Sequence, residues 1–149
     1  MGGFHNFTLE GMEKEKILEI CNGMVKGNLM ETLEIEFVDL GEDFLSARMP
    51  VTPKVHQIHG LLHGGATVAL AETVGSAAVS VLSQDPSIST VGIEISANHL
   101  KSTSSGYVTA TAKPLHMGKT IQLIEIRVVD DQDNLISHCK LSTFSLPKK

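Results

Sequence analysis

The sequence has few of the features that mark several common classes of protein. Its 149 residues include only two cysteines, Cys21 and Cys139, which lie far apart and form neither a disulfide framework nor a zinc-binding spacing. Lys and Arg form no block and the net charge is −5, so we do not expect nucleic acid as a partner. The first residues lack a basic region followed by an apolar run, which predicts no signal peptide and a cytoplasmic protein with reduced thiols.

Several catalytic signatures are also absent. The chain has no Gly-x-Ser-x-Gly motif, no phosphate-binding loop and no dinucleotide-binding fingerprint. It has no internal repeat, linker or low-complexity segment, and 42% of its residues are hydrophobic while 19% are charged. We therefore expect one globular domain over residues 1–149, with a hydrophobic core of its own.

The longest apolar run, residues 61–82, has the length of a membrane span. It is rich in Ala, Gly, Ser and Thr, opens with a His-Gly-Gly sequence and carries Glu72 near its centre. A charge in the middle of a membrane is costly and rare. The run therefore predicts a buried helix of a globular protein and no association with a membrane.

The pattern of apolar residues predicts an α+β fold. An amphipathic helix is expected first, and two strands joined as a hairpin precede the apolar helix, after a loop over residues 52–62. An antiparallel sheet curled around the apolar helix accommodates this order, and a second subunit would cover the rest of that helix. The expected elements are a helix over 9–25, strands over 32–38 and 44–51, a helix over 63–82, and strands over 89–100, 106–116, 120–129 and 135–144.

Glu72 is the only charged residue between His63 and Ser83. Burying a carboxylate is costly unless it is paired or has a chemical role as an acid, base or nucleophile. A purely structural alternative is a carboxylate bonded to backbone N–H groups or to a basic side chain. Ser76 lies one turn further along the same helical face, where it either assists the carboxylate or serves as a small packing residue. Gly65, Val68 and Ala69 complete this face, so we expect the carboxylate, the hydroxyl and the glycine opening along one stripe.

Gly64 and Gly65 open the apolar helix. The first N–H groups of a helix have no partner within it and lie at the positive end of its dipole. Because glycine leaves them accessible, they are candidates for stabilising a carbonyl oxygen that gains negative charge. The alternative is that the two glycines only permit a tight turn into the helix.

Two further groups of polar residues are candidates for a site. His56, His59 and His63 have a spacing that could gather metal ligands, but no nearby carboxylate or thiol completes the set, so we predict no metal. The strand that begins with Ile93, Ile95 and Ala97 on one face continues to His99 and Lys101, and so passes from the core to a polar site or to solvent.

Taken together, these motifs resemble the hotdog-fold acyl-CoA thioesterases, and most closely the branch of the phenylacetate-pathway and 4-hydroxybenzoyl-CoA enzymes. The resemblance covers about residues 30–146. Its most specific part is the His-Gly-Gly segment with a glutamate nine residues after the histidine. The matching residues are Gln57, Gly60-Leu61-Leu62-His63-Gly64-Gly65-Ala66, Ala71-Glu72, Ser76, the stretch 92–99 and the stretch 113–118.

The resemblance implies a hotdog fold, in which an antiparallel sheet wraps around one long central helix, with an extra N-terminal helix within residues 1–28. That N-terminal segment is variable among relatives, so we expect it to say little about the chemistry. The resemblance also implies a homotetramer built as a dimer of dimers, with active sites formed by residues of two subunits.

It further implies a role for each matching residue. The Gly64 N–H would polarise the thioester carbonyl, and Glu72 of the partner subunit would be the nucleophile or the general base. His63 and Gln57 would orient the substrate, and Ser76 would place the water or the acyl group. The substrate-binding residues would be Gly65, His99, Lys101, His116, Gly118 and Lys119. No cofactor is implied, because coenzyme A is part of the substrate, with acyl carrier protein as an alternative carrier.

Other functions remain open at this stage. A hotdog dehydratase or hydratase would also act on acyl thioesters, but would need a differently placed pair of histidine and acidic residues. A non-catalytic acyl-CoA binding module would keep the pocket and lose the acid, and an interaction scaffold would use only the subunit interface. The sequence does not specify the acyl group, which is expected to be an aryl or a medium-chain group.

Overall fold

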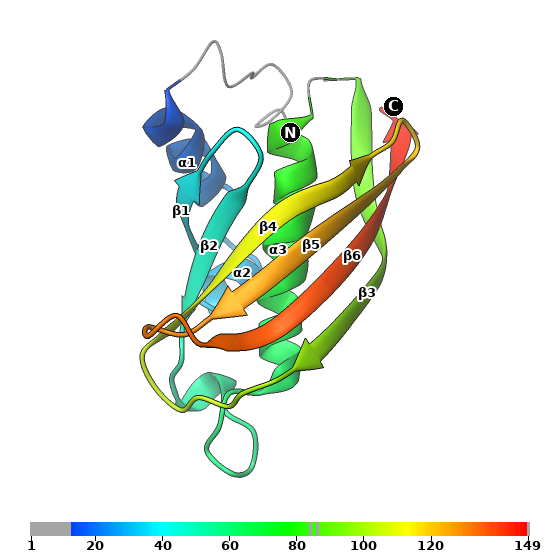
Figure 1. Ribbon diagram of the computed structural model, residues 1–149. Coiled ribbons are helices and arrows are strands. Elements are labelled where there is room, and N and C mark those ends of the chain that lie inside the picture. Colours follow the sequence, from blue (N-terminus) through cyan, green and yellow to red (C-terminus); the bar gives the residue numbers. More distant parts are fainter. Residues whose placement is uncertain (1–12, 84, 86, 149) are drawn as a thin grey trace.

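The secondary structure follows the predicted order, with one short helix added. We describe a computed structural model, which defines residues 13–83, 85 and 87–148. The elements, labelled in Figure 1, are α1 (Lys14–Gly23), α2 (Leu29–Thr32), β1 (Glu36–Leu40), β2 (Leu45–Pro50), the 3₁₀ helix η2 (Pro53–Val55), α3 (Gly64–Leu82), β3 (Ile88–His99), β4 (Tyr107–Met117), β5 (Ile121–Val129) and β6 (Leu135–Pro147).

The six strands form one antiparallel sheet in the order β1-β2-β4-β5-β6-β3, and the sheet curls around α3 (Figure 1). The chain leaves the β1–β2 hairpin, passes through α3 and returns as β3 at the opposite edge. Strands β1 and β3 are therefore the two edges. This arrangement confirms the predicted hotdog fold with an extra N-terminal helix.

The core lies between α3 and the concave face of the sheet. Every second residue is buried along β5 and along β4 as far as Ala112, as alternation predicts, and eight residues of α3 are buried in the same core. Gly75 allows this close approach, because a Cβ there would lie 2.7 Å from Leu141 Cδ2 and 3.3 Å from Ile126 Cδ1. By length and composition alone α3 could cross a membrane, but it packs here as the core helix of the fold.

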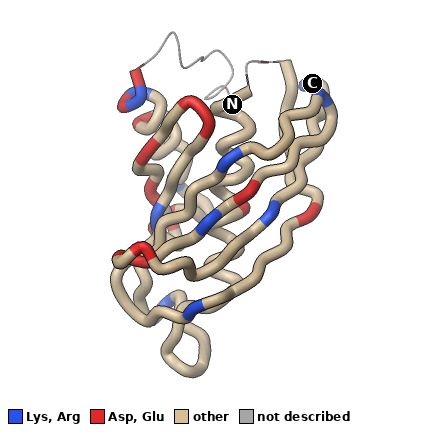
Figure 2. Tube along the Cα trace, in the orientation of Figure 1, with Lys and Arg blue, Asp and Glu red and all other residues tan. Residues whose placement is uncertain are grey.

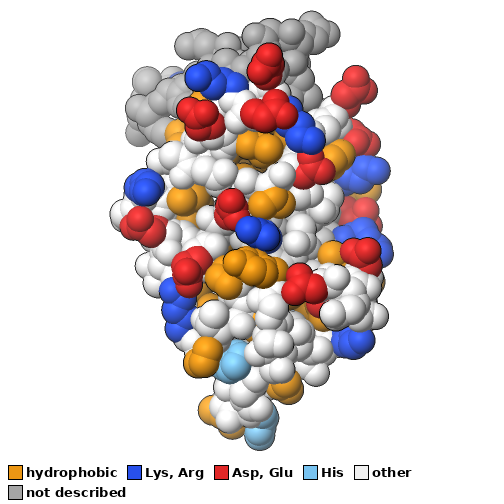
Figure 3. All heavy atoms as spheres, turned by 90° about the vertical axis from the view of Figure 1, so that its left-hand side faces the viewer, with side chains coloured by type: hydrophobic (Ala, Val, Ile, Leu, Met, Phe, Trp, Pro, Cys, Tyr) orange, Lys and Arg blue, Asp and Glu red, His pale blue; other side chains and the backbone are white. Residues whose placement is uncertain are grey.

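Apart from Glu72, α3 carries no charged residue, and charges of both signs are mixed over the other helices, the strands and the loops (Figure 2). The face that carries α1 and β1 likewise shows acidic and basic side chains interspersed with small apolar areas (Figure 3). That face does not present the continuous positive field of a nucleic-acid-binding surface.

Two details of the N-terminal third differ from the prediction. Helix α1 begins at Lys14, and the start of the predicted helix, residues 9–12, lies outside the described part of the chain. The strand predicted over 32–38 is wrong at its start, because Asn28 caps a short helix there by accepting hydrogen bonds from Met30 N at 3.1 Å and Glu31 N at 3.4 Å. Glu34 then takes a positive φ of 58°, and β1 starts only at Glu36.

Strand β3 contains a bulge that the sequence pattern did not predict. Gly92 pairs with Thr143 and Glu94 pairs with Ser142, so Ile93 is an extra residue in the ladder. The bulge interrupts the regular alternation on which the predicted face of Ile93 and Ile95 rested. Ile93 is 55% exposed, whereas Ile95 packs against the core.

Candidate active site

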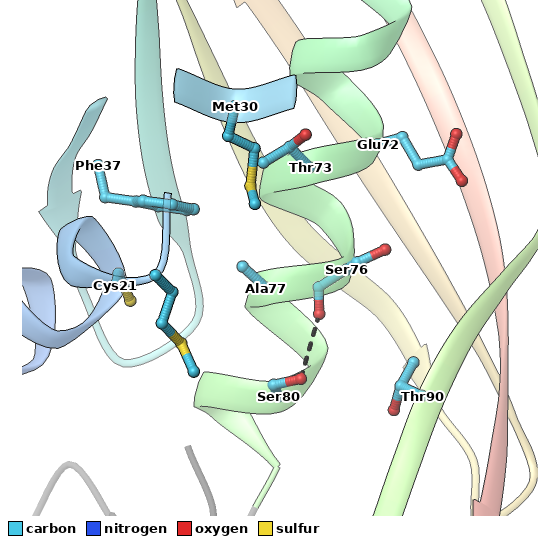
Figure 4. A pocket seen from close by; sticks show the side chains of 10 residues that line it. Cys21, Met30, Phe37, Glu72, Thr73, Ser76, Ala77, Ser80 and Thr90 are labelled. Atoms are coloured by element: carbon cyan, nitrogen blue, oxygen red, sulfur yellow. Dashed lines mark hydrogen bonds between the residues drawn. The ribbon is translucent and has the colours of Figure 1, made fainter. Parts of the chain in front are cut away.

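Glu72 lines a cavity on one face of α3. This cavity has a volume of about 460 Å³. One face of α3 forms its floor, and its walls come from α1, α2 and β1 on one side and from β3 on the other (Figure 4). The floor residues are Glu72, Thr73, Ser76, Ala77 and Ser80.

The Glu72 side chain is half-buried, and its carboxylate makes no hydrogen bond or ion pair with any residue that the structure describes. The purely structural alternative, in which a basic side chain or backbone N–H groups hold the carboxylate, therefore has no support. The bulge in β3 brings Gly92 directly beside it, and a Cβ on Gly92 would lie 2.8 Å from Glu72 Oε2. The carboxylate is therefore available to a ligand in this cavity.

Ser76 lies one turn beyond Glu72 in the same cavity (Figure 4). The neighbouring hydroxyls are engaged, since Thr73 Oγ1 donates to Ala69 O at 2.7 Å and Ser80 Oγ donates to Ser76 O at 3.5 Å. Ser76 Oγ itself bonds to no group within the described part of the chain. Its hydroxyl is therefore available to a ligand.

The start of α3 forms a second hollow of about 350 Å³. Gly64, Gln57, His99 and Lys101 are among its lining residues. The Gly64 N–H finds no acceptor among residues 13–83, 85 and 87–148, and it lies at the positive end of the helix. A Cβ on Gly64 would lie 2.7 Å from His99 Nε2, so the histidine ring packs closely over this glycine.

Gln57 and His63 are oriented by the loop that precedes α3. Gln57 Oε1 accepts hydrogen bonds from His59 N at 2.5 Å and from Leu61 N at 3.4 Å, which leaves the amide NH₂ as a donor for a ligand. His63 Nδ1 accepts from Gly65 N at 2.8 Å and so caps the helix. The Gly65 N–H is thus already used, and Gly64 supplies the free donor.

Ser137 determines how His99 presents its ring. The Ser137 hydroxyl donates to Asn98 O at 3.1 Å, so it accepts from His99 Nδ1, also at 3.1 Å. A neutral His99 therefore carries its proton on Nδ1 and turns an unprotonated Nε2 toward Gly64. Ser137 is fully buried, and the sequence offered no local signal for this role.

The two hollows share no lining residue. Gly64 and Glu72 are eight residues apart, which is about 12 Å along the helix axis. Gly65 and Ala69 lie on the same helical face as Glu72 and Ser76, but they line a third hollow beside His63. The face is therefore divided between separate hollows, and one thioester carbonyl does not reach both Gly64 and Glu72 of the same subunit.

The remaining predicted residues lie at the far end of the molecule. Gly118 and Lys119 are in the turn between β4 and β5, where they line a hollow with Ser83 and Asp85 at the end of α3. His116 is exposed in the same region, at a bulge of β4. His99 and Lys101 lie at the start of α3, about 28 Å away along the helix (Figure 1). One subunit does not bring the two groups together.

The histidines near the start of α3 do not form a metal centre. His56 Nε2 lies 3.0 Å from Ser104 O, and His63 caps the helix. Histidine side chains are visible at the lower end of the face in Figure 3. Within the part of the chain that the structure describes, no three His, Cys, Asp or Glu side chains come close enough to hold a metal ion.

Comparisons with known proteins give a consistent result. The family model for the Thioesterase superfamily matches residues 59–137. The proofreading thioesterase EntH of Cronobacter turicensis is 44% identical over 131 residues, which cover 88% of this chain and 95% of the relative. The 1,4-dihydroxy-2-naphthoyl-CoA hydrolase of Escherichia coli K12 is 43% identical over 131 residues, with 87% and 96% covered.

Solved structures agree with this result. A thioesterase from Haemophilus influenzae superimposes with a TM-score of 0.84 at 38% identity, covering 87% of this chain and 90% of its own. A variant of a thioesterase from Pseudomonas aeruginosa gives a TM-score of 0.85 at 37% identity. The match covers 88% of this chain and 94% of the Pseudomonas chain.

Proposed function

The chain belongs to the thioesterase superfamily, and from that premise we propose that it hydrolyses an acyl-CoA thioester to the free acid and coenzyme A, with Glu72 as the reacting carboxylate. The observation that carries the proposal is the Glu72 carboxylate, which lies without a protein partner in a mostly apolar cavity of about 460 Å³. That volume is within the usual range for small-molecule sites.

The complete site is formed by two subunits. Glu72 comes from one subunit and the Gly64 N–H from its partner, because the two lie in separate hollows of one chain. Edge strand β3 supports this arrangement, since its free edge carries Val91, 44% exposed, and Ile93, 55% exposed. Pairing of two such edges about a two-fold axis would cover both residues and extend the sheet, and two such dimers would form the tetramer.

The chemistry follows from these groups. The Gly64 N–H and the free amide of Gln57 hydrogen-bond to the thioester carbonyl oxygen and stabilise its negative charge in the transition state. Glu72 then attacks the carbonyl carbon and expels the coenzyme A thiolate, leaving a mixed anhydride that water hydrolyses. Alternatively, Glu72 takes a proton from the water that attacks the carbonyl. The Ser76 hydroxyl is available to position that water or the acyl group.

The coenzyme A arm lies along His99 and Lys101 and reaches residues of the partner. Lys101 supplies positive charge for a phosphate but not the bidentate geometry of an arginine. The turn residues His116, Gly118 and Lys119 lie too far away in the same subunit, so their contribution comes from the other chain. We infer a cytoplasmic enzyme, in keeping with two free, buried cysteines.

The acyl group is of the aryl or medium-chain class. The cavity beside Glu72 includes Phe37, Met24 and Met30 among its lining residues, which suits a flat or extended apolar group. The relative from Escherichia coli is named for an aryl thioester, the 1,4-dihydroxy-2-naphthoyl group.

Release of free coenzyme A, followed with a thiol reagent, tests the proposal. Wild-type protein should release coenzyme A from at least one member of a panel of aryl and medium-chain acyl-CoA thioesters, assayed beside the matching acyl carrier protein thioesters. A dehydratase or hydratase would change the acyl group without releasing a thiol. Binding without release across the whole panel would support a non-catalytic module and overturn the proposal.

A further inference from the structure

The N-terminal helix contributes directly to the cavity that contains Glu72. Cys21 and Met24, at the end of α1 and just beyond it, line the cavity together with Met30 and Phe37. In Figure 4 Phe37, Met30 and Cys21 lie on one side of the visible face of α3, and Glu72 lies on the other. This segment was expected to say little about the chemistry, yet it forms a wall of the same cavity, across the floor from Glu72.

Contacts with β1 hold α1 in a defined position. The Asn22 amide bonds to both backbone groups of Phe37, since Nδ2 donates to Phe37 O at 3.0 Å and Oδ1 accepts from Phe37 N at 2.7 Å. Asn22 thus takes the place of a neighbouring strand at the edge of the sheet. Ile17 is buried in the core, and Lys14 forms an ion pair with Asp39 at 2.6 Å. Asn22, which lies between Cys21 and Met24 in the sequence, therefore anchors this wall to β1.

The position of this wall limits how far an acyl group can extend. The cavity floor continues from Glu72 to Ser80, eight residues or about 12 Å along α3. An acyl group whose carbonyl carbon lies at Glu72 extends along this floor toward the end of α1. Cys21 is fully buried, whereas Met24 is only half-buried and has a flexible side chain. Met24, at the end of α1, is therefore the residue of this wall that a long acyl group meets.

We propose that Met24, held in place through the Asn22–Phe37 contact, is a specificity-determining residue that sets the maximum length of the acyl group. This inference rests on the proposed function, because it concerns the selectivity of the same site. Within a hydrophobic pocket, one methylene group changes kcat/KM by about 10- to 200-fold. A change of side-chain size at Met24 is large enough to move the preferred acyl length.

The test measures kcat/KM on straight-chain acyl-CoA thioesters of increasing length and on benzoyl- and naphthoyl-CoA. Met24→Ala should raise the ratio of kcat/KM on long substrates to kcat/KM on short ones about tenfold. Met24→Phe should lower the same ratio by a similar factor. Asn22→Ala should flatten the length preference, because the wall is no longer anchored. Ile20→Ala is the matched control, an apolar truncation on the same helix outside the cavity, and should keep the wild-type preference.

The outcomes separate the two proposals. If wild-type protein hydrolyses thioesters but both Met24 variants, confirmed as folded by circular dichroism, keep the wild-type length preference within twofold, the role of Met24 is overturned. If Met24→Ala does not fold, Met24→Phe and Met24→Leu carry the same comparison. If wild-type protein hydrolyses no thioester of the panel, the proposed function itself fails.

Discussion

Glu72 and Gly92 face each other across the gap between α3 and β3, so closely that a Cβ at position 92 would lie 2.8 Å from Glu72 Oε2. The contact exists because the bulge at Ile93 changes the alternation of β3 and turns position 92 toward the helix. A residue with no side chain therefore leaves room for the reacting group of the proposed mechanism.

Gly92→Ala should displace the carboxylate and lower kcat by about 10- to 100-fold, since misplacement of a catalytic group by about 1 Å can cost 10²-fold. The added methyl meets the end of a flexible side chain, so the melting temperature should change little. Gly23→Ala is the control, because a Cβ there has no atom within 4 Å. Equal kcat in the two variants would show that Gly92 has no part in positioning Glu72.

Glu72→Gln should lower kcat by about 10²- to 10⁴-fold, the scale of a positioned acid–base group, while the fold is retained. The carboxylate makes no hydrogen bond or ion pair with the described residues, so the substitution removes no stabilising contact. Steady-state kinetics and thermal unfolding measure the two effects. Glu42→Gln, in the exposed β1–β2 turn, provides the control, and comparable turnover in both variants would contradict the mechanism.

Mixed oligomers test whether the site is shared between subunits. Glu72→Gln and Gly64→Ala should each be nearly inactive, the second because its Cβ would lie 2.7 Å from His99 Nε2. Co-expression of both variants produces mixed dimers in which one of the two sites has an intact Glu72 and an intact Gly64. Roughly a quarter of wild-type activity should return for a two-fold symmetric dimer. No recovery in confirmed mixed dimers would place the whole site within one subunit.

Burial raises the pKa of Cys21 from its ordinary value of 9.0 to about 12. The folded state therefore keeps the thiol proton where the unfolded state loses it, and the free energy of unfolding falls as pH rises from about 9 to about 12. The slope is about 1.4 kcal/mol per pH unit. Urea unfolding of wild type and Cys21→Ala at pH 8 and pH 10.5 should show a steeper alkaline loss in the wild type. If the free energy of unfolding fell by the same amount in both proteins between pH 8 and pH 10.5, the raised pKa of Cys21 would be refuted.

Much of the fold could be predicted because its signals are local. The apolar run defined α3 to within one residue at its start, and alternation located the later strands. The Asn28 cap and the bulge at Ile93 were missed, since a cap competes with a strand pattern and a bulge depends on the partner strand. The cap moved the start of β1 to Glu36, and the bulge interrupted the alternation of faces along β3.

The candidate site was predictable only in part. A charge within an apolar helix marked Glu72 as a candidate, and the glycines at the helix start marked Gly64, and each of the two lines a hollow of the structure. Ser137, which orients His99, and Met24, which lines the cavity of Glu72, become visible only once distant segments pack together. Sequence spacing also placed Gly65 and Glu72 on one stripe, but could not show that neighbouring elements divide that stripe into separate hollows.

The length of β3 sets the spacing between two of its residues, each of which contacts a group of the proposed mechanism. Gly92 accompanies the carboxylate near one end, and His99 covers Gly64 at the other, seven residues or about 23 Å further along. Deleting one residue between them would shorten this spacing by about 3.3 Å and turn His99 to the opposite side of the sheet. Both contacts are therefore kept only with the present number of residues in this stretch, whatever side chains it carries.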